Sequence, residues 1–151
     1  YGSGIMNERT IDTGDGNDRI TGIVFGTGSD PRYSGHRRYG IENYGIIDTG
    51  AGNDIIVALR GGFGGGGTTD LGLGRDTLKG FGTGTFNGGA GIDKILFGQG
   101  TYTVTAPTIV SDDVTMNVNE FEKIGGAKGG LFNYANGTLT VTRDGVATFA
   151  A

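Results

Sequence analysis

Four aspartates that recur at the same place in four related segments are the residues of this chain best suited to chemistry. Each closes a Gly-x-Gly-x-Asp pattern and is followed two residues later by Ile or Leu. A carboxylate supplies the hard oxygen ligands that Ca²⁺ prefers, and glycine reaches the positive φ angles that turn main-chain carbonyls toward one point. The pattern therefore predicts cation-binding turns, each closed by one carboxylate: Asp18, Asp54, Asp76 and Asp93.

The spacing of these carboxylates indicates the elements that must position them. They lie 36, 22 and 17 residues apart, which we interpret as two, one and one coils of about 18 residues. Turns without Asp fall between them, so a strand, a turn, a returning strand and a second turn make one coil of a flattened solenoid. We predict an all-β fold, a parallel β-roll or β-helix solenoid. Its core ladder is formed by Ile20, Ile56, Leu78 and Ile95.

The pattern changes after residue 102. Residues 101–105 and 114–118 alternate polar and apolar side chains, which predicts half-buried strands. Asn136-Gly137 and Asp144-Gly145 predict two β-hairpin turns. We therefore expect a β-roll over residues 1–102, with an inserted loop at about 31–40, and a small antiparallel C-terminal cap over residues 103–151.

Composition narrows the classes of function. Glycine provides 34 of the 151 residues and hydrophobic residues only 35%, so bound metal ions would add to a thin apolar core. A net charge of −4 and a pI of about 4.8 argue against nucleic-acid binding and suit cations. The absence of Cys excludes disulfides and thiolate sites, and no apolar run is long enough to span a membrane.

Residues 13–20 and 87–95 resemble the Gly-Gly-x-Gly-x-Asp-x-apolar-x nonapeptide of the RTX family. The similarity extends, with gaps, over about residues 11–102, and residues 41–44 and 121–126 resemble the stretches that flank such repeats. The resemblance implies a parallel β-roll with Ca²⁺ between successive turns. One turn cannot complete the shell of roughly six to eight oxygens that Ca²⁺ requires, so two stacked turns would share each ion.

Carried over by position, the ligands would be the four closing carboxylates and the main-chain carbonyls of the turns, with Asp30 as a fifth carboxylate on the opposite side. We expect about two to four Ca²⁺ ions. Arg75 beside Asp76 is expected to neutralise part of the third site. The glycines of the proposed carbonyl set are Gly14, Gly16, Gly50, Gly52, Gly72, Gly74, Gly89 and Gly91.

Three more aspartates stand two residues before the first glycine of a turn: Asp12, Asp48 and Asp70. They are either additional ligands or acceptors for the amides of the turn. For the whole pattern, the alternative to metal binding is a tight turn closed by Asx hydrogen bonds.

Other candidate sites are less well formed. Residues 31–39 concentrate Arg, His and Tyr, and we interpret them as a solvated loop or subunit contact, with an anionic glycan or a nucleic acid as the alternative partner. The single histidine, His36, lacks partners for a zinc site. No serine stands in a Gly-x-Ser-x-Gly elbow, which argues against acyl-transfer catalysis. Asp112 and Asp113 with Glu120 or Glu122 are either an acid/base dyad or, in our interpretation, a surface strand end, so we expect no enzymatic activity.

Our first hypothesis is a secreted or cell-surface Ca²⁺-binding protein with a structural role, which folds when Ca²⁺ binds. Few residues precede the first repeat, so we expect its first coil to be covered by upstream repeats or by head-to-tail stacking into an oligomer or fibre. The second hypothesis is an RTX module that assists folding and type I export of a larger bacterial enzyme or adhesin. An ice- or glycan-binding face is the third.

Overall fold

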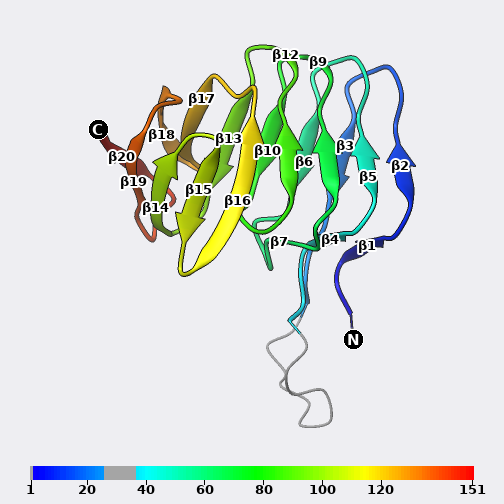
Figure 1. The fold of residues 1–151 in the computed structure, drawn as a ribbon, viewed down its shortest axis with the longest axis horizontal. Coiled ribbons are helices and arrows are strands. Elements are labelled where there is room, and N and C mark those ends of the chain that lie inside the picture. Colours follow the sequence, from blue (N-terminus) through cyan, green and yellow to red (C-terminus); the bar gives the residue numbers. More distant parts are fainter. Residues whose placement is uncertain (1, 26–36) are drawn as a thin grey trace, which may run out of the picture.

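The computed structural model describes residues 2–25 and 37–151, and every regular element in them is a β-strand. Most strands pair in parallel with strands of the preceding and following pass of the chain, so that the passes lie side by side along the long axis (Figure 1). The predicted all-β fold with parallel sheets is confirmed. Within the described ranges no helix is long and apolar enough to cross a membrane.

Five passes each give one strand to a nine-stranded sheet and one to a six-stranded sheet. In the nine-stranded sheet these parallel strands are β2 (Thr10–Asp12), β5 (Ile46–Asp48), β8 (Thr68–Asp70), β11 (Thr85–Asn87) and β16 (Val114–Asn119). In the six-stranded sheet they are β3 (Arg19–Thr21), β6 (Ile55–Val57), β10 (Thr77–Lys79), β13 (Lys94–Phe97) and β17 (Lys123–Gly126).

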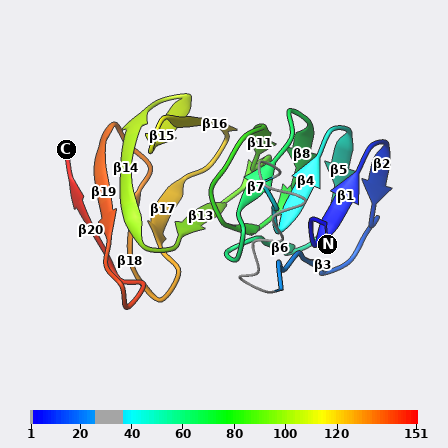
Figure 2. The ribbon, with the colours of Figure 1, turned by 90° about the horizontal axis from the view of Figure 1, so that it is seen from below.

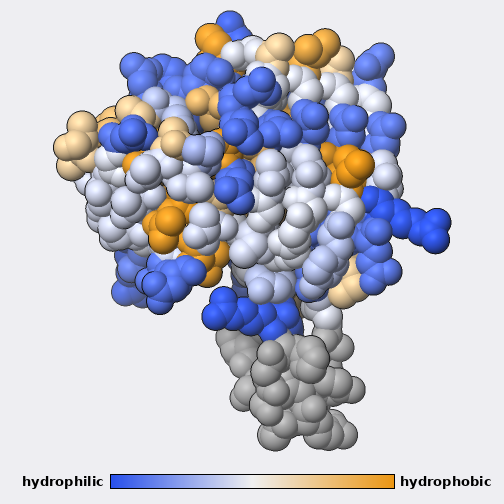
Figure 3. Space-filling model, in the orientation of Figure 1, coloured by the Kyte–Doolittle hydropathy of each residue, from blue (hydrophilic) through white to orange (hydrophobic). Residues whose placement is uncertain are grey.

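The core lies between these sheets because the middle residue of each short strand points inward. The predicted ladder is confirmed: Ile20 is 8% exposed, and Ile56, Leu78 and Ile95 are fully buried and directly paired in register. Ile124 of β17 extends it by one pass. The opposite faces are solvated, and the side seen in Figure 3 is mostly hydrophilic or neutral with a few apolar patches.

A third sheet of three strands occupies the side where the sequence predicted turns without Asp. Its strands are β1 (Ile5–Asn7), β4 (Ile41–Asn43) and β7 (Phe63–Gly64), which lie side by side in Figure 2. Asn7 Nδ2 donates to Asn43 Oδ1 at 2.8 Å, and Asn43 Nδ2 donates to the carbonyl of Thr68 at 3.0 Å. Buried amides therefore link the passes on this side, and the Glu42 carboxylate, which accepts the Ser3 hydroxyl at 2.6 Å, adds a further link.

The antiparallel strands begin near residue 100, but they do not form a continuous C-terminal block. They are β14 (Gly100–Thr105), β15 (Thr108–Ser111), β18 (Gly129–Asn133), β19 (Gly137–Val141) and β20 (Ala147–Ala150). Between them, β16 pairs in parallel with β11, and β17 with β13. The segment expected to be antiparallel from residue 103 therefore contains two parallel strands, because β14 and β15 form an excursion before the chain returns to the parallel stack.

Two local predictions after residue 100 are confirmed and one is wrong. β14 and β16 show the expected alternation of buried and exposed residues. Asp144-Gly145 joins the antiparallel strands β19 and β20. Asn136-Gly137 does not close a hairpin, because β18 pairs with β17 in one sheet and β19 with β14 in the other. The Asn136 side chain instead accepts the N–H of Ala106 at 2.9 Å.

Candidate metal centre: a column of buried carboxylates

The structure places the four predicted aspartates in one column, one on each pass. The N–H of Asp18 donates to Asp54 Oδ1, that of Asp54 to Asp76 Oδ1, and that of Asp76 to Asp93 Oδ1, each at 2.7 Å. The carboxylates of Asp54, Asp76 and Asp93 are thus each tied to the main chain of the pass before them. The in-register β-strands that follow the aspartates impose this arrangement, because they start at the same distance from each carboxylate.

The structure corrects the interpretation of one spacing. The 36 residues between Asp18 and Asp54 do not represent two coils, because the hydrogen bond between these residues shows that they lie on adjacent passes. The additional length is an excursion between β3 and β4, part of which lies in residues 26–36, outside the described residues. The excursion does not disturb the pairing of β3 with β6, because the chain returns in register.

A fifth carboxylate, which the repeat pattern did not identify, ends the column. Glu122 Oε2 accepts the N–H of Asp93 at 2.7 Å, and the N–H of Glu122 donates to the carbonyl of Asp93 at 3.1 Å. Glu122 stands just before β17, at the place that Asp occupies before β13. The resemblance of residues 121–126 to a repeat-flanking stretch was the available signal, but it did not show that Glu122 continues the column.

The second oxygen of each aspartate is buried and unpartnered. Asp54 and Asp93 are fully buried and Asp76 is 1% exposed. The Oδ2 atoms of Asp18, Asp54, Asp76 and Asp93 have no hydrogen-bond partner among the described residues. Burial of a charged oxygen without a partner is costly, so these four atoms are the strongest indication that the column binds something.

Burial and neighbouring charges oppose the ionisation of Asp76 and Asp93 in the metal-free protein. Burial, and then the neighbouring charges of Asp93 and Asp54, raise the pKa of Asp76 to about 6, although the N–H of Asp54 acts in the opposite direction. Burial, together with Glu122 and Glu120, also raises the pKa of Asp93. A cation beside these groups would reverse the repulsion between them.

The predicted glycine positions form the turns that precede the column. All eight have positive φ, near +80° to +94° at the first glycine and +129° to +148° at the second. The turns stack directly: the carbonyl of Gly50 accepts the N–H of Leu73, and that of Gly72 the N–H of Ala90, both at 2.9 Å. A carbonyl oxygen has a second lone pair, so these bonds leave one acceptor site on each.

The last turn brings the Asp93 side chain and the main chain of Glu120 close to Gly88. A Cβ built on Gly88 would lie 3.0 Å from Asp93 Oδ2 and 2.0 Å from the carbonyl oxygen of Glu120. Glu120 has a φ of 58°, a left-handed conformation that is uncommon outside glycine. An unpartnered carboxylate oxygen and a main-chain carbonyl therefore approach the same position, which suits an oxygen-seeking cation.

The three outer aspartates act as Asx-turn acceptors. Asp12, Asp48 and Asp70 each accept, through Oδ1, the N–H of the glycine two residues later, at 3.0, 3.0 and 3.2 Å. The three side chains therefore act as acceptors for turn amides, which was the alternative to a role as additional ligands. These bonds hold the start of each turn. The three side chains lie in register on β2, β5 and β8, apart from the inner column.

The remaining candidates do not join the column. Asp30 and His36 lie outside the described residues. Arg75 donates its main-chain N–H to Asn53 Oδ1 at 2.9 Å, and no ion pair joins its guanidinium to Asp76. Nowhere in residues 2–25 and 37–151 do three Asp, Glu or His side chains converge as a metal-binding group. An ion in the column would therefore depend on main-chain oxygens and water besides carboxylates.

Replacement of Asp76 by Asn separates the two properties of this carboxylate, its hydrogen-bond acceptor and its negative charge. Asn keeps an oxygen for the N–H of Asp54 but removes the buried charge. Because the folded-state pKa of Asp76 is raised to about 6, the metal-free folded protein binds more protons than the unfolded chain, and its stability falls as pH rises through that value. We expect Asp76→Asn to raise the melting temperature at pH 7 in chelator and to lower it in Ca²⁺.

Thermal unfolding of both proteins, with EGTA and with Ca²⁺, measures this reversal; a change of 1 kcal/mol corresponds to about 2–4 °C for a domain of this size. Asp12→Asn is the matched control, because Asp12 is exposed and lies outside the column. It should shift neither measurement. A loss of stability in Asp76→Asn under both conditions would contradict the role assigned to the charge.

Comparison of this chain with protein-family models, with curated proteins and with solved structures finds no match.

Proposed function

We propose that this chain is a Ca²⁺-binding β-roll solenoid of the RTX type, closed by antiparallel strands at its C-terminal end, in which ions between the turns complete the folded state. The observation that carries the proposal is the row of four buried Oδ2 atoms without hydrogen-bond partners in the described part of the chain. Asx-closed turns alone do not explain it, because the Asx bonds are made by the outer aspartates.

The energetics of the column favour a bound cation. Adjacent strands lie about 4.8 Å apart, and two like charges at that distance repel by roughly 3 kcal/mol at an effective dielectric constant of 20. None of the five carboxylates has an ion-pair partner within the described part of the chain. A divalent cation between two passes converts the repulsion into attraction, and its binding free energy adds to that of folding.

The column residues would divide the ligand set among the passes. Oδ2 of each aspartate is the available carboxylate donor. The carbonyl of Glu120 and the carboxylate of Glu122 would serve the last interval in place of a further repeat. Ca²⁺ would supply charge neutralisation and a bridge between passes, and no reaction is assigned to it. We propose a structural, non-enzymatic role, secreted or at the cell surface.

Two extensions of this role remain proposals. The strands β1, β2 and β3 lie at the ends of their sheets and have no partner on one side among the described residues. Another copy of the chain, stacked head to tail, or preceding repeats of a longer enzyme or adhesin would pair with these edges. Sedimentation in millimolar Ca²⁺ distinguishes them, since self-stacking predicts concentration-dependent growth and discrete monomers contradict it.

Counting the bound ions tests the proposal directly. Isothermal titration with Ca²⁺, and native mass spectrometry of the titrated protein, should show about two to four ions. Glu122→Gln should lower the count by one, whereas Glu8→Gln, outside the column, should leave it unchanged. Mg²⁺ should not substitute, because it demands a small octahedral shell. A protein that binds no Ca²⁺ would refute the proposed function.

A further inference from the structure

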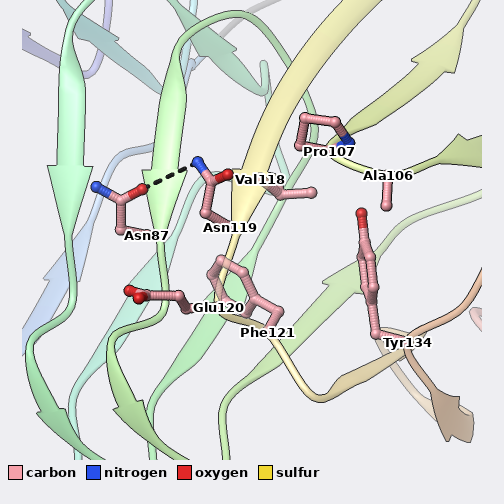
Figure 4. A pocket seen from close by; sticks show the side chains of 8 residues that line it. All are labelled: Asn87, Ala106, Pro107, Val118, Asn119, Glu120, Phe121 and Tyr134. Atoms are coloured by element: carbon pink, nitrogen blue, oxygen red, sulfur yellow. Dashed lines mark hydrogen bonds between the residues drawn. The ribbon is translucent and has the colours of Figure 1, made fainter.

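A second candidate site lies where the parallel passes meet the antiparallel strands. A cavity of about 670 Å³ opens between the ends of β11 and β16, the turn from β14 to β15, and the segment that follows β18 (Figure 4). Its volume is in the range of small-molecule sites, which is roughly 300–1,000 Å³. The lining residues are Asn87, Ala106, Pro107, Val118, Asn119, Glu120, Phe121 and Tyr134.

One wall of the cavity carries amides and a carboxylate. Asn119 Nδ2 donates to Asn87 Oδ1 at 3.2 Å, a bond drawn in Figure 4. It leaves both side-chain N–H groups of Asn87, and one N–H and the side-chain oxygen of Asn119, without a partner in the described part of the chain. Glu120 adds an exposed carboxylate. Donors and acceptors are therefore presented together on one side.

The conformation of Glu120 fixes this wall. Its φ of 58° is strained for a residue with a side chain, and such strain concentrates at functional sites. Pairing of β16 with β11 holds the preceding residue, Asn119, opposite Asn87. The polar groups are thus positioned by the strands before any ligand arrives, which lowers the entropy cost of binding.

The facing wall is apolar. Figure 4 shows Ala106, Pro107 and Tyr134 across the cavity from the Asn pair. Phe121 forms its base and is 6% exposed. The Tyr134 hydroxyl is enclosed and has no partner among the described residues, and burial raises the pKa of Tyr134 to about 12. The Tyr134 side chain is half-buried and lines the cavity.

We propose that this cavity binds a neutral saccharide, with sugar hydroxyls on the Asn87–Asn119–Glu120 wall and sugar C–H groups on the wall of Pro107 and Tyr134. Among the described residues that line the cavity, the only charged one is Glu120, so an anionic ligand would be repelled. A purely apolar ligand would strip water from two amides and a carboxylate without replacing their hydrogen bonds. No lining side chain is assigned to an ion, but the main-chain carbonyl of Glu120 is, so sugar binding is tested with Ca²⁺ present, and its failure would leave the expected ion count unchanged.

The test uses the whole chain in millimolar Ca²⁺, with maltose, cellobiose, lactose and diacetylchitobiose as probes and galacturonic acid as the charged comparison. Saturation-transfer NMR should detect at least one neutral disaccharide, and isothermal titration should give a millimolar dissociation constant. Binding of none of them, or galacturonic acid binding as tightly as the neutral sugars, would overturn the proposal.

Matched variants locate the binding. Asn119→Ala and Glu120→Gln should each weaken it about tenfold, the effect of one lost hydrogen bond to a ligand. Asp113→Asn is the control, because Asp113 is also an acid at positive φ, 63°, but does not line the cavity. Equal weakening in all three variants, or in none, would place the sugar elsewhere and refute the site.

Tyr134 provides a test of the apolar wall. Tyr134→Phe removes only an enclosed hydroxyl that no described residue contacts through a hydrogen bond, so we expect unchanged sugar binding and a melting temperature equal to or above that of the wild type. Tyr134→Ala should weaken binding about tenfold or more, because the ring contact is lost. If Tyr134→Ala keeps full affinity while it remains folded by circular dichroism, the ring is not part of the site.

Discussion

Removal of Ca²⁺ with EGTA should lower the melting temperature of this protein substantially, and return of Ca²⁺ should restore it. A ligand present at 100 times its dissociation constant stabilises the folded state by about 2.7 kcal/mol per site. Two such sites correspond to a shift of roughly 10–20 °C in a domain of this size. The unpartnered Oδ2 atoms are the physical reason, because without a cation they remain buried charges that repel one another.

Circular dichroism at rising temperature, with and without EGTA, measures the shift. The control protein carries Asn at the four aspartate positions of the column, which are Asp18, Asp54, Asp76 and Asp93, and keeps Glu122. It should keep its β signal and lose the response to EGTA, since Asn retains the Oδ1 acceptor but cannot supply the charge. A wild-type melting temperature that chelation leaves unchanged would disprove the metal-binding interpretation.

Replacement of Gly74 by Ala should destabilise the fold more than any single carboxylate change. A Cβ on Gly74 would lie 1.6 Å from the carbonyl oxygen of Gly52 on the neighbouring pass, and φ is +148°. The turns that precede the carboxylate column are in direct main-chain contact, so neither pass can move aside without loss of inter-pass hydrogen bonds. We expect a loss of more than about 3 kcal/mol, measured by urea unfolding in Ca²⁺.

Gly16 is the matched control for this substitution. It occupies the same place in the first turn, with a φ of +129°, but a Cβ at this position would have no atom of the described residues within 4 Å. Gly16→Ala should therefore cost only the backbone strain, about 1–3 kcal/mol. Equal losses of unfolding free energy in the two variants would show that the glycines are needed only for their φ angles, and that the close approach of the turns does not contribute to stability.

Much of the candidate site could be predicted from the sequence because it repeats over short distances. The period of the Gly-x-Gly-x-Asp turns places one carboxylate per turn and one apolar residue two positions later, and local geometry then determines which side of the strand each faces. This is why the ladder of Ile56, Leu78 and Ile95 could be identified from the repeat pattern alone. The alternation of buried and exposed residues in β14 and β16 could also be predicted, because it depends only on local side-chain direction.

Other features depend on which distant segments meet, and no local pattern contains that information. The adjacency of Asp18 and Asp54 required the pairing of β3 with β6 across an excursion of the chain. Glu122 joined the column only because the chain returns to the parallel stack at β16 and β17 after β14 and β15. Asn136-Gly137 has the local chemistry of a hairpin, yet its flanking strands enter different sheets.

By itself, the sequence determined the type of turn, the residue that closes it and the residue buried behind it, because these depend on φ preferences and side-chain alternation within about ten residues. Only the tertiary structure decided which carboxylates are neighbours, that a glutamate ends their column, and that each aspartate keeps one oxygen without a partner among the described residues. Those outcomes follow from the register between strands that are distant in sequence. Burial of the whole core selects this register, and no single segment determines it.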